Sequence, residues 1–276
     1  MIYELTPDRF SITTPLFQAM DHHLAISSIM AGLTPARIFV DEETHPTSLM
    51  AWVGHRHILA GVPDNAVFNT EIARVFEQVV IPHKLARGLR WMSLYYAPEQ
   101  WSDSIEKHLL PGRNLIPSLR QYYSTNTSDN VTDCESHELP EGFELRAVDA
   151  GLLKLTHLRN LESLKEEMCS ERPTVTDFLD KSFGVCIVTR DELAGWCLSE
   201  YNCADRCEIG IETGEAYRRL GLATAMTRAL VDIARARGVR QVGWHCRADN
   251  RPSAATALKS GFNHVCDYPA RVVGLT

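Results

Sequence analysis

The sequence predicts an α/β (α+β) protein of two domains, a smaller α/β domain over residues 1–123 and a second over residues 141–276. The chain has 276 residues, about twice the commonest domain size. Strand-like and helix-like runs alternate along both halves. The polar, turn-forming stretch Ser124–Asn130 contains no large apolar side chain, and all eight cysteines lie at or after Cys134. We therefore expect a linker over residues 124–140.

The N-terminal half has the alternating pattern of a small α/β domain. Its predicted elements are strands at Arg37–Asp41, Ser48–Val53, Trp91–Ala97 and Leu115–Tyr123, with helices at Asn69–Leu85 and Pro98–Leu110. Histidines at positions 22, 23, 55 and 57 lack a third ligand at the spacing of a metal site. We expect no chemistry from this half.

The C-terminal half repeats the pattern in a cleaner order. Its predicted elements are a strand at Phe143–Val148, helices at Leu152–Met168 and Pro173–Lys181, strands at Val185–Thr189, Leu193–Glu200 and Cys207–Thr213, a helix at Leu222–Arg237, a strand at Val239–His245, a helix at Pro252–Ser260, and a strand from Phe262. The helix at Leu222–Arg237 has the strongest pattern. Its apolar residues share one face, and Gly238 follows as a stop signal.

Composition excludes several classes of function. The net charge of -7 and the lack of a basic, aromatic-rich stripe argue against nucleic-acid binding. No apolar run approaches the ~20 residues of a membrane helix. Residues 1–9 include Tyr3, Glu4 and Asp8 where a signal peptide would have an apolar stretch, so we expect no signal peptide. The cysteines fit neither a disulfide scaffold nor a zinc pattern, so we expect reduced thiols and no metal. We expect a cytoplasmic protein without a membrane partner, either a monomer or a homodimer.

A short motif lies between the strand Cys207–Thr213 and the helix that follows. Its residues are Arg218, Arg219, Leu220, Gly221, Leu222, Ala223 and Thr224, which fit the pattern R/Q-x-x-G-x-G/A. A helix N-terminus offers unpaired N–H groups and the positive end of the helix dipole to an anion. Gly221 and Ala223 allow a close approach of the backbone. The motif therefore predicts a diphosphate site.

Over roughly residues 143–273 the chain resembles the GCN5-related N-acetyltransferase (GNAT) superfamily, in which this turn binds the pyrophosphate of acetyl-CoA. The run Asn250-Arg251-Pro252-Ser253 and the pair Gly261-Phe262 are similar to two further superfamily motifs. More closely, Cys207–Thr213, the Gly-Leu-Ala-Thr run at residues 221–224 and the Asn-x-Pro-Ser segment at residues 250–253 look like the branch that contains the zwittermicin A resistance acetyltransferase. The resemblance implies a mixed, mostly antiparallel sheet flanked by helices, with acetyl-CoA (coenzyme A) as the cofactor.

The resemblance also implies which residues hold the cofactor. The backbone of Ile211, Glu212 and Thr213 is expected to pair with the pantetheine arm. Asn250 and Ser253 are expected to contact the same cofactor, although a helix or turn cap is the other interpretation of Asn250.

Acetyl transfer needs a neutral amine, whereas a free alkylamine titrates near ~10.4. Glu208 begins the strand before the motif, close to where relatives place a catalytic glutamate, and we predict that it is the base. An ordinary solvated carboxylate is the alternative. Many relatives have a tyrosine as general acid where this chain has Ala257. Tyr268, Cys246, Ser253, water or no acid at all stay open for that role.

Charge is segregated around the motif. Residues 133–215 carry 19 acidic and 8 basic side chains, whereas residues 216–276 carry 3 acidic and 10 basic ones. The basic block suits the polyanionic cofactor, and the acidic block suits a cationic acceptor, with Glu162, Glu166 and Glu167 as one acidic helix face. Merely solvated helix faces are the alternative.

These observations predict an acetyl-CoA-dependent N-acetyltransferase acting on a primary amine of a small polar cationic molecule. An aminopolyol or an aminoglycoside-like compound would fit. A weak or inactive acyl-CoA-binding sensor or interaction module, and a protein or peptide N-acetyltransferase, are the alternatives.

Overall fold

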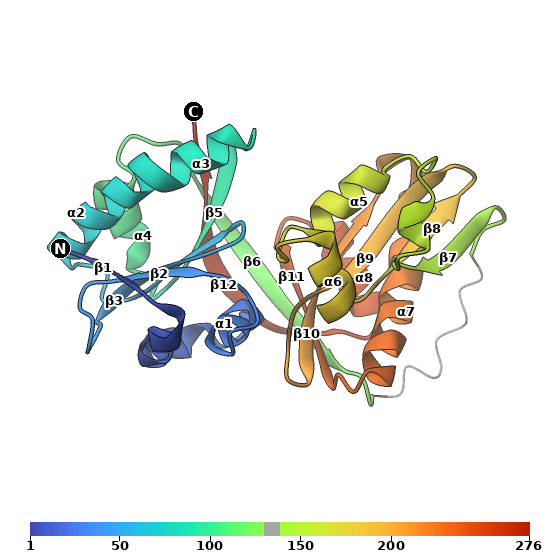
Figure 1. Ribbon diagram of the computed structural model, residues 1–276, viewed down its shortest axis with the longest axis horizontal. Helices are drawn as coiled ribbons and strands as arrows, with labels where there is room; N and C mark the ends of the chain where they lie inside the picture. Colours follow the sequence, from blue (N-terminus) through green and yellow to red (C-terminus); the bar gives the residue numbers. More distant parts are fainter. Residues whose placement is uncertain (130–138) are drawn as a thin grey trace. The chain divides into compact units, whose positions relative to one another are not determined.

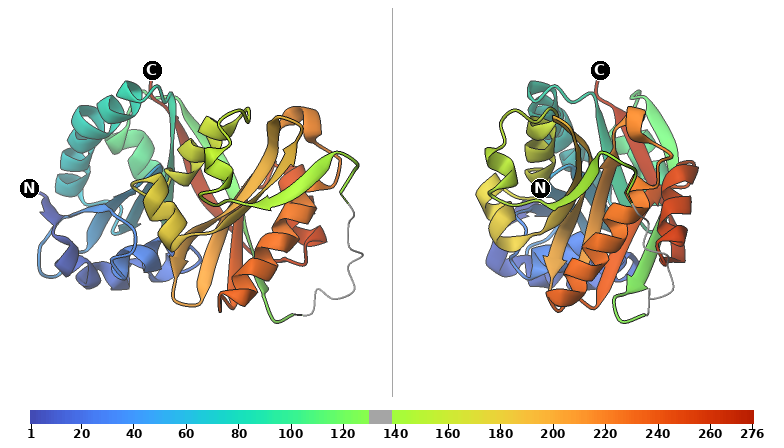
Figure 2. Two further views of the ribbon diagram at one scale, coloured as in Figure 1. Left: turned by 45° about the vertical axis from the view of Figure 1, so that its right-hand side comes forward. Right: turned by 90° about the vertical axis from the view of Figure 1, so that its right-hand side faces the viewer.

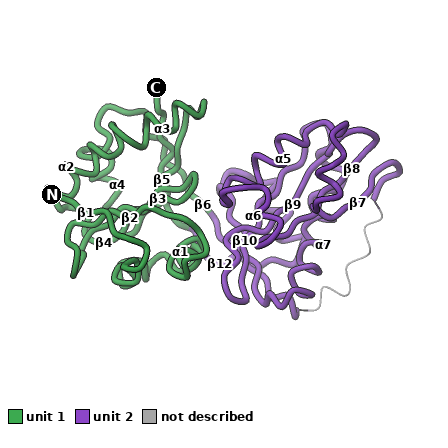
Figure 3. Tube along the Cα trace, viewed as in Figure 1, with its two compact units in different colours: residues 1–120, 268–276 green, residues 121–267 purple. Residues whose placement is uncertain are grey.

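The computed structural model of the chain describes residues 1–129 and 139–276. These form two compact units, shown in Figure 3: unit 1 contains residues 1–120 and 268–276, and unit 2 contains residues 121–267. The boundaries between the units fall after residues 120 and 267, whereas the expected linker spans residues 124–140. Residues 124–126 belong to a strand, and residues 130–138 of the expected linker lie outside the described residues.

Unit 1 contains a sheet with helices on both faces (Figure 1). Its elements are β1 (Tyr3–Leu5), the 3-10 helix η1 (Pro7–Met20), α1 (Leu24–Met30), β2 (Arg37–Val40), β3 (Ser48–Val53), β4 (Arg56–Gly61), α2 (Ala66–Val75), the π-helix η2 (Phe76–Val80), α3 (Ile81–Ala86), β5 (Trp91–Ala97), α4 (Trp101–Ser104), the π-helix η3 (Ile105–Leu109) and the first part of β6 (Leu115–Asn126). The strands predicted here are confirmed. β4 was not predicted, and it forms a hairpin with β3 across Gly54 and His55.

Unit 2 is an α/β layered structure. Its elements are the last part of β6, β7 (Phe143–Ala147), the 3-10 turn η4 (Leu152–Lys154), α5 (Leu161–Met168), α6 (Val175–Lys181), β8 (Gly184–Thr189), β9 (Glu192–Cys203), β10 (Arg206–Thr213), η5 (Glu215–Tyr217), α7 (Leu222–Ala236), β11 (Gln241–Arg247), α8 (Arg251–Lys259) and the start of β12 (Asn263–Gly274). β7 to β10 pair antiparallel in order, and β10 pairs parallel with β11. The predicted mixed, mostly antiparallel sheet flanked by helices is confirmed.

Two apolar cores cover the two faces of the unit 2 sheet. The apolar face of α7, including Leu222, Met226 and Leu230, packs on one face of the sheet together with α8. α5 and α6 pack on the other face through Leu161, Leu164, Phe178 and their neighbours. Figure 2 shows these helices on opposite sides of the strands. Side chains alternate along a strand, so those of β10 point in turn towards the α7 and α8 layer and towards the α5 and α6 layer.

The predicted helix over Leu152–Met168 is wrong in its first half. Only the 3-10 turn η4 and α5 are helical, because the segment between them bonds to the start of β9. The Arg159 N–H donates to Asp191 O at 2.8 Å, and the Arg159 O accepts from Leu193 N–H at 3.1 Å. Asn160 then has a left-handed φ of 66° at the start of α5. Pairing with a distant strand overrides the local helical pattern.

Both units have the same strand order, and each receives its sixth strand from the other half of the sequence. The order is β1-β2-β3-β4-β5 followed by β12 in unit 1, and β7-β8-β9-β10-β11 followed by β6 in unit 2. In each unit the fourth and fifth strands are parallel. The chain is therefore an internal structural repeat with exchanged strands, and residues 268–276 of the predicted second domain lie in unit 1.

Candidate active site

The parallel strands β10 and β11 separate halfway along their length. Their pairing runs from Arg206 opposite Gln241 to Ile209 opposite Trp244, and within the described residues it goes no further. On its other side β10 remains paired with β9 as far as Thr213 opposite Gly195. The backbone of Gly210–Thr213 thus has one edge outside the sheet ladder. The predicted cofactor residues Ile211, Glu212 and Thr213 lie on this edge.

The predicted diphosphate turn leads from η5 into α7. Gly221 takes a left-handed φ of 79° as the N-cap residue, and no side chain caps this 15-residue helix. Its first N–H groups are therefore not occupied by a side chain, as an anion site requires. Arg218, Arg219 and Leu220 are exposed beside it, Ala223 is half-buried, and Leu222 and Thr224 anchor the first turn in the core.

Asn250 and Ser253 have structural roles. Asn250 Oδ1 accepts from the Ser253 N–H at 3.3 Å and so caps α8, which matches the alternative interpretation of this asparagine. Ser253 Oγ accepts from Trp244 Nε1–H at 3.1 Å. Their contact with the cofactor stays a prediction.

Glu208, the predicted base, is buried in a group that spans three strands. Its side chain is 1% exposed, and its Oε1 lies 3.2 Å from Nε2 of His245 on β11. The Tyr122 ring, on β6, stacks on the His245 ring at a centroid distance of 4.7 Å. No sequence motif pointed to His245 or Tyr122. His245 stands two residues after Gly243, the parallel partner of Glu208, so strand register was the signal for it.

The same face of β10 carries a cluster of carboxylates. Glu208 and Glu212 flank Gly210 on this face, as their alternation predicts. A Cβ added to Gly210 would lie 1.9 Å from Glu200 Oε1 and 3.7 Å from Glu167 Oε1, so two carboxylates from neighbouring elements converge on this point. Burial, followed by the charges of Glu200 and Glu212, raises the pKa of Glu167 to about 7.

The acidic face expected on the first helix is only partly correct. Glu162 and Glu166 are exposed on α5, and Glu162 accepts a hydrogen bond from Lys165 at 2.7 Å. Glu167 alone of the three belongs to the cluster over β10, because one residue along a helix turns the side chain by about 100°.

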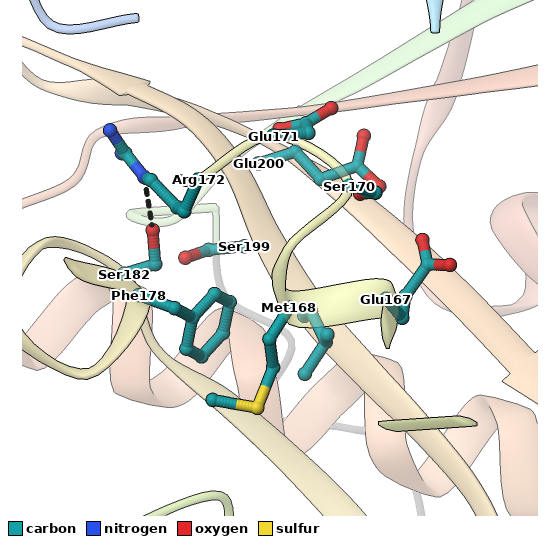
Figure 4. Close-up of a pocket in the computed structure, with 10 residues that line it drawn as sticks. Glu167, Met168, Ser170, Glu171, Arg172, Phe178, Ser182, Ser199 and Glu200 are labelled. Atoms are coloured by element: carbon teal, nitrogen blue, oxygen red, sulfur yellow. Dashed lines mark hydrogen bonds between the residues drawn. The ribbon is translucent and has the colours of Figure 1, made fainter. Parts of the chain in front are cut away.

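A small pocket adjoins this cluster, as Figure 4 shows. α5, α6, the loop between them and β9 contribute its lining, which includes Glu167, Glu200 and the buried Arg172. The Arg172 Nε–H donates to Ser182 Oγ at 3.0 Å. The pocket therefore combines polar and charged groups with the apolar side chains of Met168, Phe178 and Leu198 on the α5 and α6 side of the sheet.

Ala257, where relatives have a tyrosine, and the candidate acid Cys246 lie in the core of α7 and α8, whereas the candidate acid Tyr268 belongs to unit 1. Ala257 is fully buried in the core between α7 and α8, so its position offers only an apolar side chain. Cys246 is buried in the same core. Tyr268 is buried in unit 1, where its Oη accepts from the Arg120 Nε–H at 3.3 Å and burial raises the pKa of its phenol.

The seven cysteines within the described residues are all free, and no group of three metal-ligating side chains occurs in that part of the chain. No helix among the described residues combines the length and apolar character of a membrane span.

Comparisons with known proteins agree on one family. The model of the GNAT acetyltransferase family matches residues 14–271. The Bacillus subtilis protein named uncharacterized N-acetyltransferase YdfB is 24% identical over 97% of each chain. The crystal structure of a GCN5-related N-acetyltransferase-like protein from Streptococcus suis matches with a TM-score of 0.70, at 22% identity, over 96% of this chain and 98% of that one. A tandem GNAT protein from the clavulanic acid biosynthesis pathway matches with a TM-score of 0.60, at 10% identity, over 100% and 98%. The chain belongs to the GNAT acetyltransferase family.

Proposed function

We propose that this chain transfers the acetyl group of acetyl-CoA to a primary amine of a small, polar, cationic acceptor in a ternary complex. One observation carries the proposal. The unpaired edge of β10 leads through a short turn to the uncapped N-terminus of α7. A donor with an amide-containing arm and a diphosphate matches both features, since the edge offers backbone hydrogen bonds and the helix end offers N–H groups.

The residues of unit 2 fit such a donor. Ile211, Glu212 and Thr213 would hold the arm through their backbone, and residues 218–224 would hold the diphosphate. Left-handed Gly221 leaves the approach free of a side chain, and exposed Arg218 and Arg219 add positive charge. Acetyl-CoA supplies an activated thioester, whose carbonyl the backbone N–H groups of β10 would polarise.

Glu208 is proposed as the base for the amine. Accepting a proton makes the amine nitrogen lone pair available for attack on the thioester carbonyl. Because Glu208 is 1% exposed, transfer takes place either at close contact or through one water molecule. We propose no general acid, because the core position Ala257 cannot supply one.

A cationic acceptor is supported by the carboxylates on this face of the sheet. Glu167 and Glu200 converge on the point above Gly210, and burial, followed by repulsion from the charges of Glu200 and Glu212, raises the pKa of Glu167. A second ammonium group on the acceptor would relieve that repulsion. This favours polyamino compounds, such as aminopolyols of the type that the zwittermicin A resistance branch suggests.

The experiment is a panel of cationic, neutral and acidic amines incubated with acetyl-CoA, with thiol release and acetylated product both measured. Cationic amines should react best, and their KM should rise with added salt because screening shortens the attraction to about 8 Å at physiological ionic strength. Acetyl-CoA binding without transfer to any amine would overturn the proposed activity. A preference for acidic amines would overturn the acceptor class alone.

A further inference from the structure

We propose that His245 is a positioning residue that donates a hydrogen bond from Nε2 to Glu208 and so holds the Glu208 carboxylate ionised and oriented. This inference rests on the proposed role of Glu208 as the base. His245 lies on β11, whereas Glu208 lies on β10, and the hydrogen bond between them runs from the His245 N–H to the Glu208 carboxylate.

Strand register brings the two side chains together. Glu208 stands opposite Gly243 in the parallel pairing of β10 and β11, and His245 lies two residues further along β11 on the same face. The atoms Nε2 and Oε1 are 3.2 Å apart, and the two side chains are 5% and 1% exposed. Buried polar groups of this kind are stabilised by mutual hydrogen bonding.

The packing around the pair restricts the imidazole ring. Tyr122 stacks on it with an interplanar angle of 26°. Gly243 makes this arrangement possible, because a Cβ there would lie 2.9 Å from Tyr122 Cε2 and 3.4 Å from Glu208 Cγ. A side chain at position 243 would therefore displace the stacked ring of Tyr122. The imidazole ring is held with Nε2 directed at Glu208.

Charge explains why the direction of the hydrogen bond matters. Glu200 on β9 is the antiparallel partner of Glu208, so a second carboxylate lies nearby on the adjoining strand. Burial and a like charge both favour protonation of a carboxyl group, which would remove the base. An N–H donor aimed at Glu208 counters both effects. It engages Oε1, so the amine proton would be accepted at the other oxygen, Oε2, while the N–H electron pair stays on the amine nitrogen.

The first test determines which nitrogen of the His245 ring carries a proton, and it does not depend on catalysis. Nitrogen NMR of protein labelled at histidine reports which ring nitrogen carries a proton, and the resonances absent from His245→Asn identify those of His245. Protonated Nε2 in the wild-type protein, alone or together with protonated Nδ1, supports the proposal. A proton on Nδ1 alone would mean that Glu208 donates, and it would overturn the proposal even if acetyl transfer is confirmed.

The second test is a mutant cycle on the acetyl-transfer rate. His245→Asn should lower kcat by about 10-fold to 100-fold and leave the KM for acetyl-CoA unchanged, a smaller loss than removal of the base itself. In the Glu208→Gln background the same change should have little further effect, because the two residues act as one unit. If His245→Asn lowers kcat as much in the Glu208→Gln background as in the wild-type protein, the proposal is overturned.

His264 provides a matched control. It also pairs with a carboxylate, at 2.7 Å from Asp267 Oδ1, and it contacts a tyrosine ring, that of Tyr123. His264→Asn should leave kcat unchanged. If Glu208→Gln itself retains the full rate, the role of Glu208 as the base fails and the positioning role fails with it. Absence of transfer in the wild-type protein would instead count against the proposed function.

Discussion

Glu200 Oε1 occupies the space above Gly210 in which a side chain would stand, 1.9 Å from the position of an added Cβ. The two residues lie on the adjacent strands β9 and β10, so a glycine on one strand makes room for a carboxylate on the other. The carboxylate is thereby directed over β10, beside Glu167 and next to the unpaired edge of the strand.

Gly210→Ala should displace the Glu200 carboxylate and raise the KM for a cationic acceptor, with the affinity for acetyl-CoA unchanged. The clash involves the end of a flexible side chain, so the loss of unfolding free energy should stay below about 2 kcal/mol. Steady-state kinetics and denaturant unfolding measure the two effects. Glu200→Gln, which removes the charge without the clash, is the control and should raise the same KM. An unchanged KM for the acceptor in both variants would show that these carboxylates do not contribute to acceptor binding.

Glu167→Gln should alter the pH dependence of stability. The pKa of this carboxyl group is raised to about 7, so the folded protein binds the proton more tightly than the unfolded chain does. That contribution to stability is fully present below the ordinary pKa of glutamate and is lost as the pH rises through 7. The variant should therefore gain Tm relative to wild type between pH 5 and pH 8, as measured by thermal unfolding. Glu162→Gln, at an exposed position on the same helix, should show no such trend.

Gly221→Glu should abolish binding of acetyl-CoA, because it places bulk and negative charge at the uncapped start of α7. Gly238→Glu is the matched control, since Gly238 has a φ of 82° just beyond the other end of the same helix. Both variants carry the strain of a side chain at positive φ, but only the first should lose binding by calorimetry. Equal affinity for acetyl-CoA in the two variants would show that the turn at Gly221 is not part of the cofactor site.

Glu208→Gln should lower the rate of acetyl transfer by roughly 10² to 10⁴, with little effect on the affinity for acetyl-CoA. The variant should recover rate as the pH approaches the pKa of the amine, near ~10.4 for a lysine-like group, because hydroxide and water then suffice to deprotonate it. A pH profile of kcat/KM for both proteins makes the comparison. Parallel profiles would indicate that another group serves as the base.

One acetyl-CoA should bind per chain, although both units share a strand order. In unit 1 the parallel pair β4 and β5 stays paired as far as Ala60 opposite Ala97, without the separation seen in unit 2. The start of α2 is capped by Asn65 Oδ1, and Asn65 Nδ2 donates to the Asp41 carboxylate at 2.9 Å. A capped helix end beside a carboxylate disfavours a diphosphate. Calorimetry should give a stoichiometry near one, and two equivalents would contradict this.

Features that depend on local pattern could be predicted from the residues alone. Helix α7 follows from its apolar periodicity and from Gly238, and its observed bounds differ from the prediction by one residue. The motif placed Gly221 at the start of that helix, and the structure adds that this residue takes a left-handed φ of 79°. Side chains alternate along any strand, so a strand over residues 207–213 puts Glu208 and Glu212 on one face whatever lies beside it.

The surroundings of those residues, in contrast, depend on how the whole chain folds. His245 reaches Glu208 through the register of two parallel strands, Tyr122 stacks on it from β6, and Glu200 fills the space over Gly210. The pairing of Arg159 with β9 shortened a helix that the local pattern extended to Leu152. The exchange of β6 and β12 between the units likewise left no local signal. Contacts between segments far apart in the chain depend on strand pairing and burial, which no single window of sequence contains.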